Sequence, residues 1–357
     1  MANAAEKAVL AERIWPVLGL ILIVGLITLI ATASGSTELS RTVTEALVRI
    51  VVVVGIYIFV GNSGVLSFGH ISFMAIGAYG TAWQTCCPQL KPFTMRGLPN
   101  FLVHTTIPTL PAALASGALA AVFGLVVGAV IMRLSGIAAS IATLALLFII
   151  NVIYSNWQSV TLGKGSLVGL PTYVTTLVAF TWVVVTMIAA YVYQCSRFGL
   201  ELRAAREDEV AARALGIDIY RQRLIAFAIS AFFVGIGGVL YGHFLGVISI
   251  DVFFLDTTFL TLAMLVVGGM RSLAGAVVGV LIISAVIEVL RRLETGIDIN
   301  GFVISLPSGS QEIVLAVAML LIFLFRPRGI MAGRELQWIF SKGANREVEQ
   351  PALDEAP

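Results

Sequence analysis

Residues 203–216 read RAAREDEVAARALG, a charged, alanine-rich stretch between two apolar runs that are each long enough to cross a membrane. Alanine, arginine and glutamate are strong helix formers, and two oppositely charged pairs stand four residues apart, Arg203 with Glu207 and Glu209 with Arg213. We therefore expect a short surface helix in the water phase. An ordinary charged loop on a solvated face is the alternative interpretation.

One face of this predicted helix suits a docking partner, because its small side chains would let another backbone approach closely. That face carries Ala204, Ala211, Ala212 and Leu215, whereas a helix lying on the membrane would present Trp, Phe and Leu. Gly216 stands where a helix commonly ends in a left-handed glycine. The segment is predicted to be a docking site for a partner in the water phase.

The composition places the chain in a membrane. Its 357 residues are 59% hydrophobic and 12% charged, with a mean hydropathy of +0.99, whereas soluble domains are about half apolar and about one quarter charged. No alternating pattern typical of a β-barrel is present, so we predict an all-α, polytopic helical bundle. Runs of about 20 apolar residues predict ten crossings, at 16–33, 43–60, 64–83, 108–131, 137–155, 175–195, 223–242, 256–270, 273–290 and 312–326.

The distribution of Lys and Arg orients the bundle. With both termini in the cytosol, the segments on that side hold 15 of the 22 basic residues, the other side holds 6, and Arg49 lies within a span. The positive-inside rule therefore predicts that both termini and loop 197–222 are cytosolic. We divide the chain into a cytosolic segment (1–15), a transmembrane domain (16–330) and a disordered cytosolic tail (331–357). The net charge of +2 gives no argument for nucleic acid.

The first apolar run ends in Ala-Thr-Ala (31–33), which could imitate the cleavage site of a signal peptide. We favour an uncleaved first span, because the preceding region carries Glu6 and Glu12 rather than a compact basic stretch. The three cysteines show no spacing typical of a metal site or a disulfide framework.

Glycine marks two places where the predicted bundle is irregular. GNSGVLSFGH (61–70) and GGMRSLAG (268–275) each interrupt an apolar run with glycine and small polar residues. Broken helices at membrane depth are tolerated only where they face protein or a water-filled cavity, so we predict a broken or re-entrant helix around 61–82. The two breaks could belong to two related halves that run in the same direction. Tight turns with close helix packing are the alternative.

The first break also supplies a candidate translocation path. Small polar groups facing lipid would lack hydrogen-bond partners, so we expect them to face a subunit interface or an internal cavity. The candidates are Asn62, Ser63, Ser67, Gly69, His70, Gly77 and Thr143. An intramembrane enzyme using His70 with Ser67 or Ser63 is disfavoured, because a lone His in a glycine-rich turn is more often structural.

Seven stretches, in order over most of residues 50–330, resemble the LivM-type permease of branched-chain amino-acid ABC importers. They are GNSGVLSFGHISFMAIGAY (61–79), LSGIAASIATLA (134–145), TLGKGSLVGLP (161–171), SRFGLELRAAREDEVAARALGID (196–218), SAFFVGIGGVLYG (230–242), LAMLVVGGMRSLAGAVVGV (262–280) and LIFLFRPRGI (321–330). The resemblance implies a bacterial inner-membrane subunit that pairs with a second, LivH-like permease, two cytosolic ATPase subunits and a periplasmic substrate-binding protein.

The same resemblance casts residues 203–216 as the coupling helix, and it marks Val210 as an insertion relative to the general importer motif. The residues it assigns to ATPase coupling are Arg203, Arg206, Glu207, Asp208, Glu209, Ala211, Ala212, Arg213, Leu215 and Gly216. The chain has no phosphate loop of its own. ATP and Mg²⁺ are therefore expected on the partner ATPases, with no cofactor, metal or catalytic residue on this chain.

A secondary transporter is the main rival, and it would usually place an ionisable residue near the membrane centre. Arg49 in the second span and Glu288 near the outer end of the ninth have no obvious partner at matched depth, although Glu288 is expected to pair with Arg291 or Arg292. We therefore favour an importer. A path without fixed charges suits a neutral or zwitterionic solute such as a branched-chain amino acid, while urea, other amino acids and aromatic or small carboxylate compounds stay open.

Overall fold

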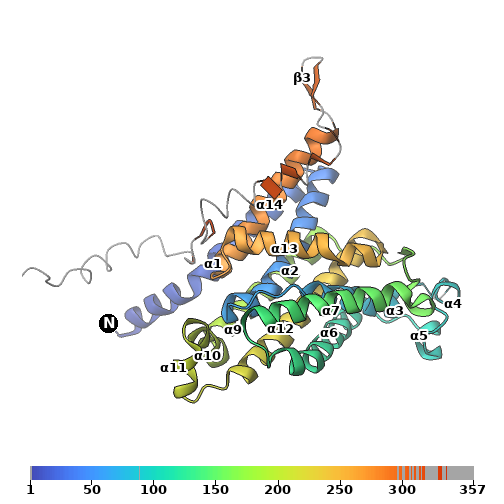
Figure 1. Ribbon diagram of the computed structural model, residues 1–357. Coiled ribbons are helices and arrows are strands. Elements are labelled where there is room, and N and C mark those ends of the chain that lie inside the picture. The colour runs from blue at the N-terminus through green and yellow to red at the C-terminus, as the bar shows by residue number, and fades with distance from the viewer. Residues whose placement is uncertain are drawn as a thin grey trace, which may run out of the picture.

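The chain folds into a bundle of long helices in a computed structural model (Figure 1). The structure describes residues 2–87, 89–295, 297–299, 302–304, 307, 309–310, 313–314, 316–317, 329–331 and 335. Within these residues, seven helices are long and apolar enough to cross a membrane. The prediction of an all-α, polytopic membrane protein is confirmed.

The seven long helices follow the predicted spans. They are α1 (Ala2–Ala33), α2 (Thr37–Ser63), α6 (Thr109–Ile131), α7 (Gly136–Asn156), α9 (Thr176–Cys195), α12 (Ile219–Leu245) and α14 (Leu273–Thr295). Two shorter helices, α3 (His70–Thr85) and α13 (Leu255–Gly268), pack among them. The connections hold α4 (Lys91–Thr94), α5 (Asn100–His104), α8 (Gln158–Thr161), α10 (Arg197–Glu207), α11 (Glu209–Ala214), η1 (Ile250–Phe253) and two antiparallel pairs, β1 (Leu167–Val168) with β2 (Val247–Ile248) and β3 (Ile297–Ile299) with β4 (Phe302–Ile304).

Two of the ten predicted spans form helices shorter than a full crossing. α3 begins at His70 rather than at residue 64, because Gly64 takes a left-handed conformation (φ 73°) that ends α2. α13 has 14 residues. The tenth predicted span (312–326) and the predicted tail (331–357) lie almost entirely outside the described residues, so ten crossings stay a prediction.

α12 is the centre of the bundle and packs against α2, α3 and α6. Glycine lets α3 and α12 cross almost backbone to backbone. A Cβ on Gly77 would lie 2.1 Å from the carbonyl oxygen of Gly235, and one on Gly238 would lie 1.9 Å from that of Met74. No larger residue fits at either position, so the close packing of this core depends on glycine.

Glu288 and Arg49, the two ionisable residues singled out within the spans, are each paired. Glu288 accepts hydrogen bonds from Arg291 (2.5 Å) and Arg292 (2.8 Å), which confirms the pairing predicted for it. The expectation that Arg49 lacks a partner is wrong, because it donates to Glu45 one helical turn away (2.5 Å).

The two ends of the bundle carry different elements (Figure 1). α10 and α11, which contain most of the charged 203–216 stretch, project at one end, and α4 and α5 lie at the other. The carboxyl end of α2 lies beside α10, where the Arg206 guanidinium donates to the carbonyl oxygen of Gly61 (2.6 Å). The amino end of α2 lies beside the carboxyl end of α14, where Thr42 donates to Glu288 (3.2 Å).

Candidate coupling site

The charged stretch 203–216 forms two helices rather than one. α10 ends at Glu207, Asp208 is extended (φ −152°, ψ 110°), and α11 follows directly. The Asp208 carboxylate accepts hydrogen bonds from the amides of Val210 (2.8 Å) and Ala211 (3.0 Å), which caps α11. The prediction of one continuous helix is wrong at this point, because a short carboxylate within the run can satisfy a new helix start.

The glycine predicted to end the stretch does so. Gly216 is left-handed (φ 80°), and its amide donates to the carbonyl oxygen of Arg213 (3.0 Å). The next amide, of Ile217, reaches back to Ala212 (3.1 Å). This pair of hydrogen bonds is the Schellman motif, which satisfies the last carbonyls of a helix.

Two arginines of α10 fasten the loop to the ends of two long helices. Arg203 donates through Nη2 to the carbonyl oxygen of Gln194 in α9 (2.8 Å), and Arg206 donates through Nη1 to that of Gly61 in α2 (2.6 Å). These carbonyls belong to the last turns of their helices, where no intrahelical donor remains for them. The loop is therefore held rigidly against the bundle.

The acidic residues of the loop are also engaged within this chain. Glu209 pairs with Arg213, as predicted (3.4 Å), and with the buried Arg223 at the start of α12. Glu207 lies beside Arg206 (2.8 Å) and 3.5 Å from Arg271. The hydrogen bond and charge of Arg206, with the charge of Arg271, hold the pKa of Glu207 below its ordinary value.

The expected pairing of Arg203 with Glu207 does not occur within the described part of the chain, because each side chain is drawn to a different partner. Charge reversal at Glu209 would likewise act first on this chain, since it would set a cation against Arg223. The exposed apolar side chains of the loop, which take part in none of these ion pairs, are therefore the ones best placed to meet a partner.

Those apolar side chains form an exposed tip, which we define as Val210, Ala211 and Leu215. Val210 is 79% exposed and Leu215 is 80% exposed, and Ala211 is also exposed. Ala212, placed on this face from the sequence, instead points inward and packs in a small cluster with Ala205 and Ile219. It supports the tip from beneath.

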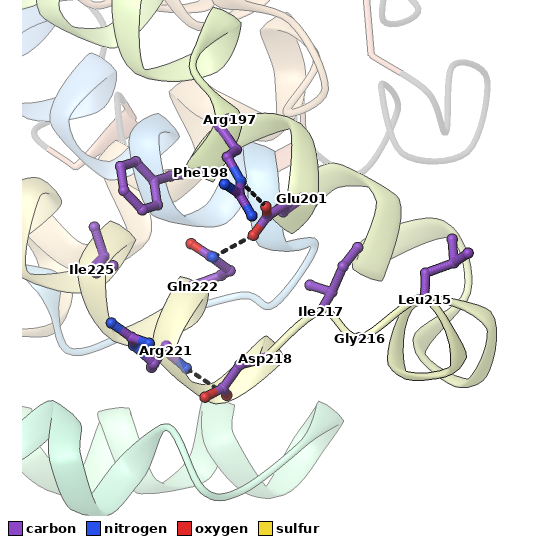
Figure 2. A pocket seen from close by; sticks show the side chains of 10 residues that line it. All are labelled: Arg197, Phe198, Glu201, Leu215, Gly216, Ile217, Asp218, Arg221, Gln222 and Ile225. Atoms are coloured by element: carbon purple, nitrogen blue, oxygen red, sulfur yellow. Dashed lines mark hydrogen bonds and ion pairs between the residues drawn. The ribbon is translucent and has the colours of Figure 1, made fainter.

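A cavity of about 300 Å³ lies beside the exposed tip (Figure 2). Arg197, Phe198 and Glu201 line it from α10, Arg221, Gln222 and Ile225 line it from α12, and the 215–218 turn closes one side. Glu201 accepts a hydrogen bond from Arg197 within α10 (2.7 Å) and one from Gln222 of α12 (2.5 Å), and the second braces α10 against α12.

The residues proposed for a translocation path lie inside this chain. Asn62, Ser63, Ser67, His70 and Thr143 are all buried. The Ser67 hydroxyl lies 2.7 Å from Nδ1 of His70. The imidazole is surrounded by the rings of Phe59, Phe73 and Phe227.

The two glycines of this set are buried by backbone. A Cβ on Gly69 would lie 2.4 Å from the carbonyl oxygen of Thr143, and Gly77 faces Gly235. The Thr143 hydroxyl accepts from the amide of Phe68 (3.2 Å). This arrangement packs α3 and the turn before it against α7 and α12, and a role of these residues in the path stays a prediction.

Sequence reasoning missed the residues that hold the loop in place. Gln194 lies in the last turn of α9, Arg223 lies near the start of α12, and Arg271 lies in the second glycine-rich break. Nothing in a hydropathy profile distinguishes them from ordinary flanking residues. Among the residues that the structure describes, no group of three His, Cys, Asp or Glu residues is placed to hold a metal ion.

Comparison with known proteins gives one family and several relatives. The profile of the family described as branched-chain amino acid transport system / permease component matches residues 38–325. The high-affinity branched-chain amino acid transport system permease protein LivM of Escherichia coli K12 is 26% identical over 344 residues, covering 84% of this chain and 72% of that protein. No solved structure matches the chain.

Two further relatives match shorter parts. The high-affinity branched-chain amino acid transport system permease protein LivH of Salmonella typhimurium LT2 is 30% identical over 167 residues, covering 46% of this chain and 50% of that protein. The nucleoside ABC transporter permease protein NupC of Lactococcus lactis MG1363 is 39% identical over 69 residues, covering 19% of this chain and 22% of that protein.

Proposed function

We propose that this chain, which belongs to the permease-component family of branched-chain amino acid transport systems, forms with a second permease the membrane route of an ATP-driven importer. The chain itself is a non-catalytic permease subunit. ATP and Mg²⁺ are bound by partner ATPase subunits in the cytosol, and a periplasmic binding protein delivers the solute from the other side. The membrane is the bacterial inner membrane, with both termini in the cytosol.

The observation that carries this proposal is the exposed tip on a firmly held loop. Val210 and Leu215 are each about 80% exposed to water, so their side chains contribute little packing energy within this chain. Their burial by a partner would be favourable. Caps at both ends of α11 and the arginine anchors of α10 let the loop carry force as a rigid body. Closure of ATPase subunits against it would therefore rock the attached helices.

Docking at the tip is tested by a charged double variant, Val210→Glu with Leu215→Glu. We expect loss of ATPase copurification and a more than tenfold fall in uptake, on the order of the loss of an interface hot spot. Because both side chains are exposed, the thermal unfolding midpoint of the purified chain should stay unchanged.

The matched control is Phe93→Glu, which changes a side chain that is 74% exposed at the opposite end of the bundle. ATPase copurification should survive in this variant. Full copurification and uptake in the double variant would show that the loop is no more than a charged turn.

Sidedness is tested by cysteine labelling in a background without the three native cysteines. A cysteine at Gly97 or Lys164 should react with an impermeant reagent from outside, and one at Asp208 should react only after permeabilisation. The reversed pattern would overturn the topology.

For the solute we propose a neutral or zwitterionic compound, most simply a branched-chain or other amino acid. The LivM and LivH relatives support this class, and the NupC relative adds nucleosides to urea and aromatic or small carboxylate compounds as alternatives. Calorimetry on the purified partner binding protein, with leucine, urea, adenosine and benzoate as probes, decides between them.

A further inference from the structure

A carboxylate from the far end of the chain sits on the amino end of α14. Oε1 of Glu335 accepts from the amide of Leu273 (2.8 Å), and Oε2 accepts from that of Ala274 (3.1 Å). The first amides of a helix have no intrahelical partner and carry the positive end of its dipole, so a carboxylate there is well placed. Glu335 thus caps α14 from 62 residues away along the chain.

Residues 329–331, shortly before Glu335, contact the carboxyl end of α13. The amide of Ile330 donates to the carbonyl oxygen of Val267 (2.9 Å), and that of Met331 donates to Gly268 (3.0 Å). Gly329 is left-handed (φ 74°) and lies so close that a Cβ on it would stand 2.5 Å from Cα of Gly269. We call residues 329–331 with Glu335 the clasp.

The clasp reaches loop 197–222, the coupling loop, through one buried residue, Gln194 of α9, which uses both its side chain and its backbone carbonyl. Its amide nitrogen donates to Oε1 of Glu335 (3.4 Å), its amide oxygen accepts from the Tyr57 hydroxyl (2.7 Å), and its backbone carbonyl accepts from Arg203 (2.8 Å). Gln194 therefore touches α2, the clasp and the loop at the same time.

A second contact joins the loop to α13 and α14, which together form a helical hairpin. Glu207 of the loop lies 3.5 Å from Arg271, in the turn between α13 and α14. The hairpin is stiff, because a Cβ on Gly279 of α14 would lie 1.9 Å from the carbonyl oxygen of Met264 in α13. A displacement of its turn would therefore move α13 and α14 together.

We infer that Glu335 is a positioning residue of the transport cycle, which ties the amino end of α14 through Gln194 to the coupling loop. Movement of the loop then reaches the α13–α14 hairpin as well as α9 and α12. The inference rests on the proposed function for its role in transport, while the physical link between Glu335 and the loop can be measured without any partner.

The link is tested by hydrogen exchange on the full-length chain in lipid nanodiscs, comparing Glu335→Gln with the unchanged protein. A simple helix cap would speed exchange only near residues 273–276. The inference requires that exchange also speeds up in peptides covering 203–207, by about fivefold, a modest coupling between two sites. Unchanged exchange in those peptides would overturn it.

Two further variants sharpen the result. Glu288→Gln removes a carboxylate with two arginine partners at the other end of α14, and it should leave exchange at 203–207 unchanged. Gln194→Met breaks the bridge, so adding Glu335→Gln to it should give no further change in the loop. Additive effects would mean that the two residues act independently, which contradicts the inference.

In the reconstituted transporter, Glu335→Gln should lower the solute moved per ATP hydrolysed by about fivefold, while ATPase copurification stays intact. That outcome separates the two proposals. Failure of the ATPases to bind the unchanged chain would overturn the proposed function. If the ATPases bind but Glu335→Gln leaves the solute moved per ATP hydrolysed unchanged, the proposed role of Glu335 is wrong.

Discussion

The two glycine-rich breaks, 61–70 and 268–275, are closed in different ways. At the first break, side chains from elsewhere in the bundle complete the backbone: Ser140 donates to the carbonyl oxygen of Leu66 (2.6 Å), and Thr143 accepts from the amide of Phe68 (3.2 Å). At the second break, the clasp supplies the partners from a distant part of the chain. The first break is completed by side chains of a packed helix, α7, whereas the second is completed by residues that lie far from it in the sequence.

This difference separates a fixed element from an adjustable one. A turn buried among long helices can move only if their packing moves with it, because cores are close-packed. A turn held by a carboxylate and a few backbone hydrogen bonds can be released by breaking those bonds alone, without repacking the long helices. We therefore expect the first break to govern stability and the second to govern coupling.

The largest loss of stability should come from a feature that the two breaks share. The helix that follows each break, α3 or α14, packs against a neighbouring helix through a glycine. Gly77→Val in α3 and Gly279→Val in α14 would each drive a side chain into a backbone carbonyl. We expect each to destabilise the fold by about 3 kcal/mol or more, seen as loss of monodisperse protein in detergent.

Gly80→Ala is the control for this prediction, since its Cβ would make ordinary contacts at 3.4 Å with Leu119 and Ser116. If Gly279→Val folded normally while Gly77→Val did not, the α13–α14 hairpin would not be the stiff unit that the clasp is proposed to move.

The second prediction concerns the arginine that closes the first break. Arg206→Ala should cost about 1–3 kcal/mol of stability, because the carbonyl of Gly61 loses a charged donor and the stem of Arg206 no longer covers Gly64. Arg213→Ala, whose side chain is 67% exposed, should stay within about 0.5 kcal/mol. Equal thermal midpoints for the two variants would contradict the view that the first break is fixed by buried contacts.

Local signals in the sequence predicted much of this molecule. Hydropathy placed the long helices because about 20 apolar residues are needed to cross a bilayer, and Gly216 was predicted because few other residues tolerate a left-handed helix end. The spacing of four between Glu45 and Arg49 is also a local signal, because opposite charges one helical turn apart can pair. Glu335 was not readable, because no local pattern connects it with a helix that starts 62 residues earlier.

The coupling site shows the same division. Charge pattern and resemblance located the loop, but periodicity alone could not show that Asp208 divides it or that Ala212 faces inward. Val210, which the resemblance marks as an insertion relative to the general importer motif, is among the most exposed apolar side chains of the loop. Which side of a short helix faces the bundle depends on tertiary contacts such as that of Glu209 with Arg223.

The third prediction decides between packing and transport at the first break. Ser67→Ala removes the hydrogen-bond partner of Nδ1 of His70 within a buried aromatic cage, and it should cost about 1–2 kcal/mol of stability. If the pair only packs helices, uptake per folded transporter should be unchanged. Reduced uptake at an unchanged thermal midpoint would instead restore these residues to the translocation path.

The smallest effect is expected at the exposed contact of the second break, between Arg271 and Glu207. Both side chains are 60% exposed, so the pair is screened and contributes little. Arg271→Ala should leave the thermal midpoint of the chain within error, and 0.5 M salt should reproduce in the unchanged protein any small shift that the variant shows.

The pH dependence of this contact follows from the pKa of Glu207, which is held below its ordinary value first by the hydrogen bond from Arg206 and then by charge. A carboxylate with a lowered pKa contributes fully above its ordinary pKa and is lost only as pH falls through the lowered one. Any small shift in thermal midpoint that Arg271→Ala produces should therefore be constant from pH 5 to pH 8 and shrink only in more acid solution. A shift that varied across the neutral range would show that a group other than Glu207 titrates at the turn, and would contradict the assignment of this shift to the contact of Glu207 with Arg271.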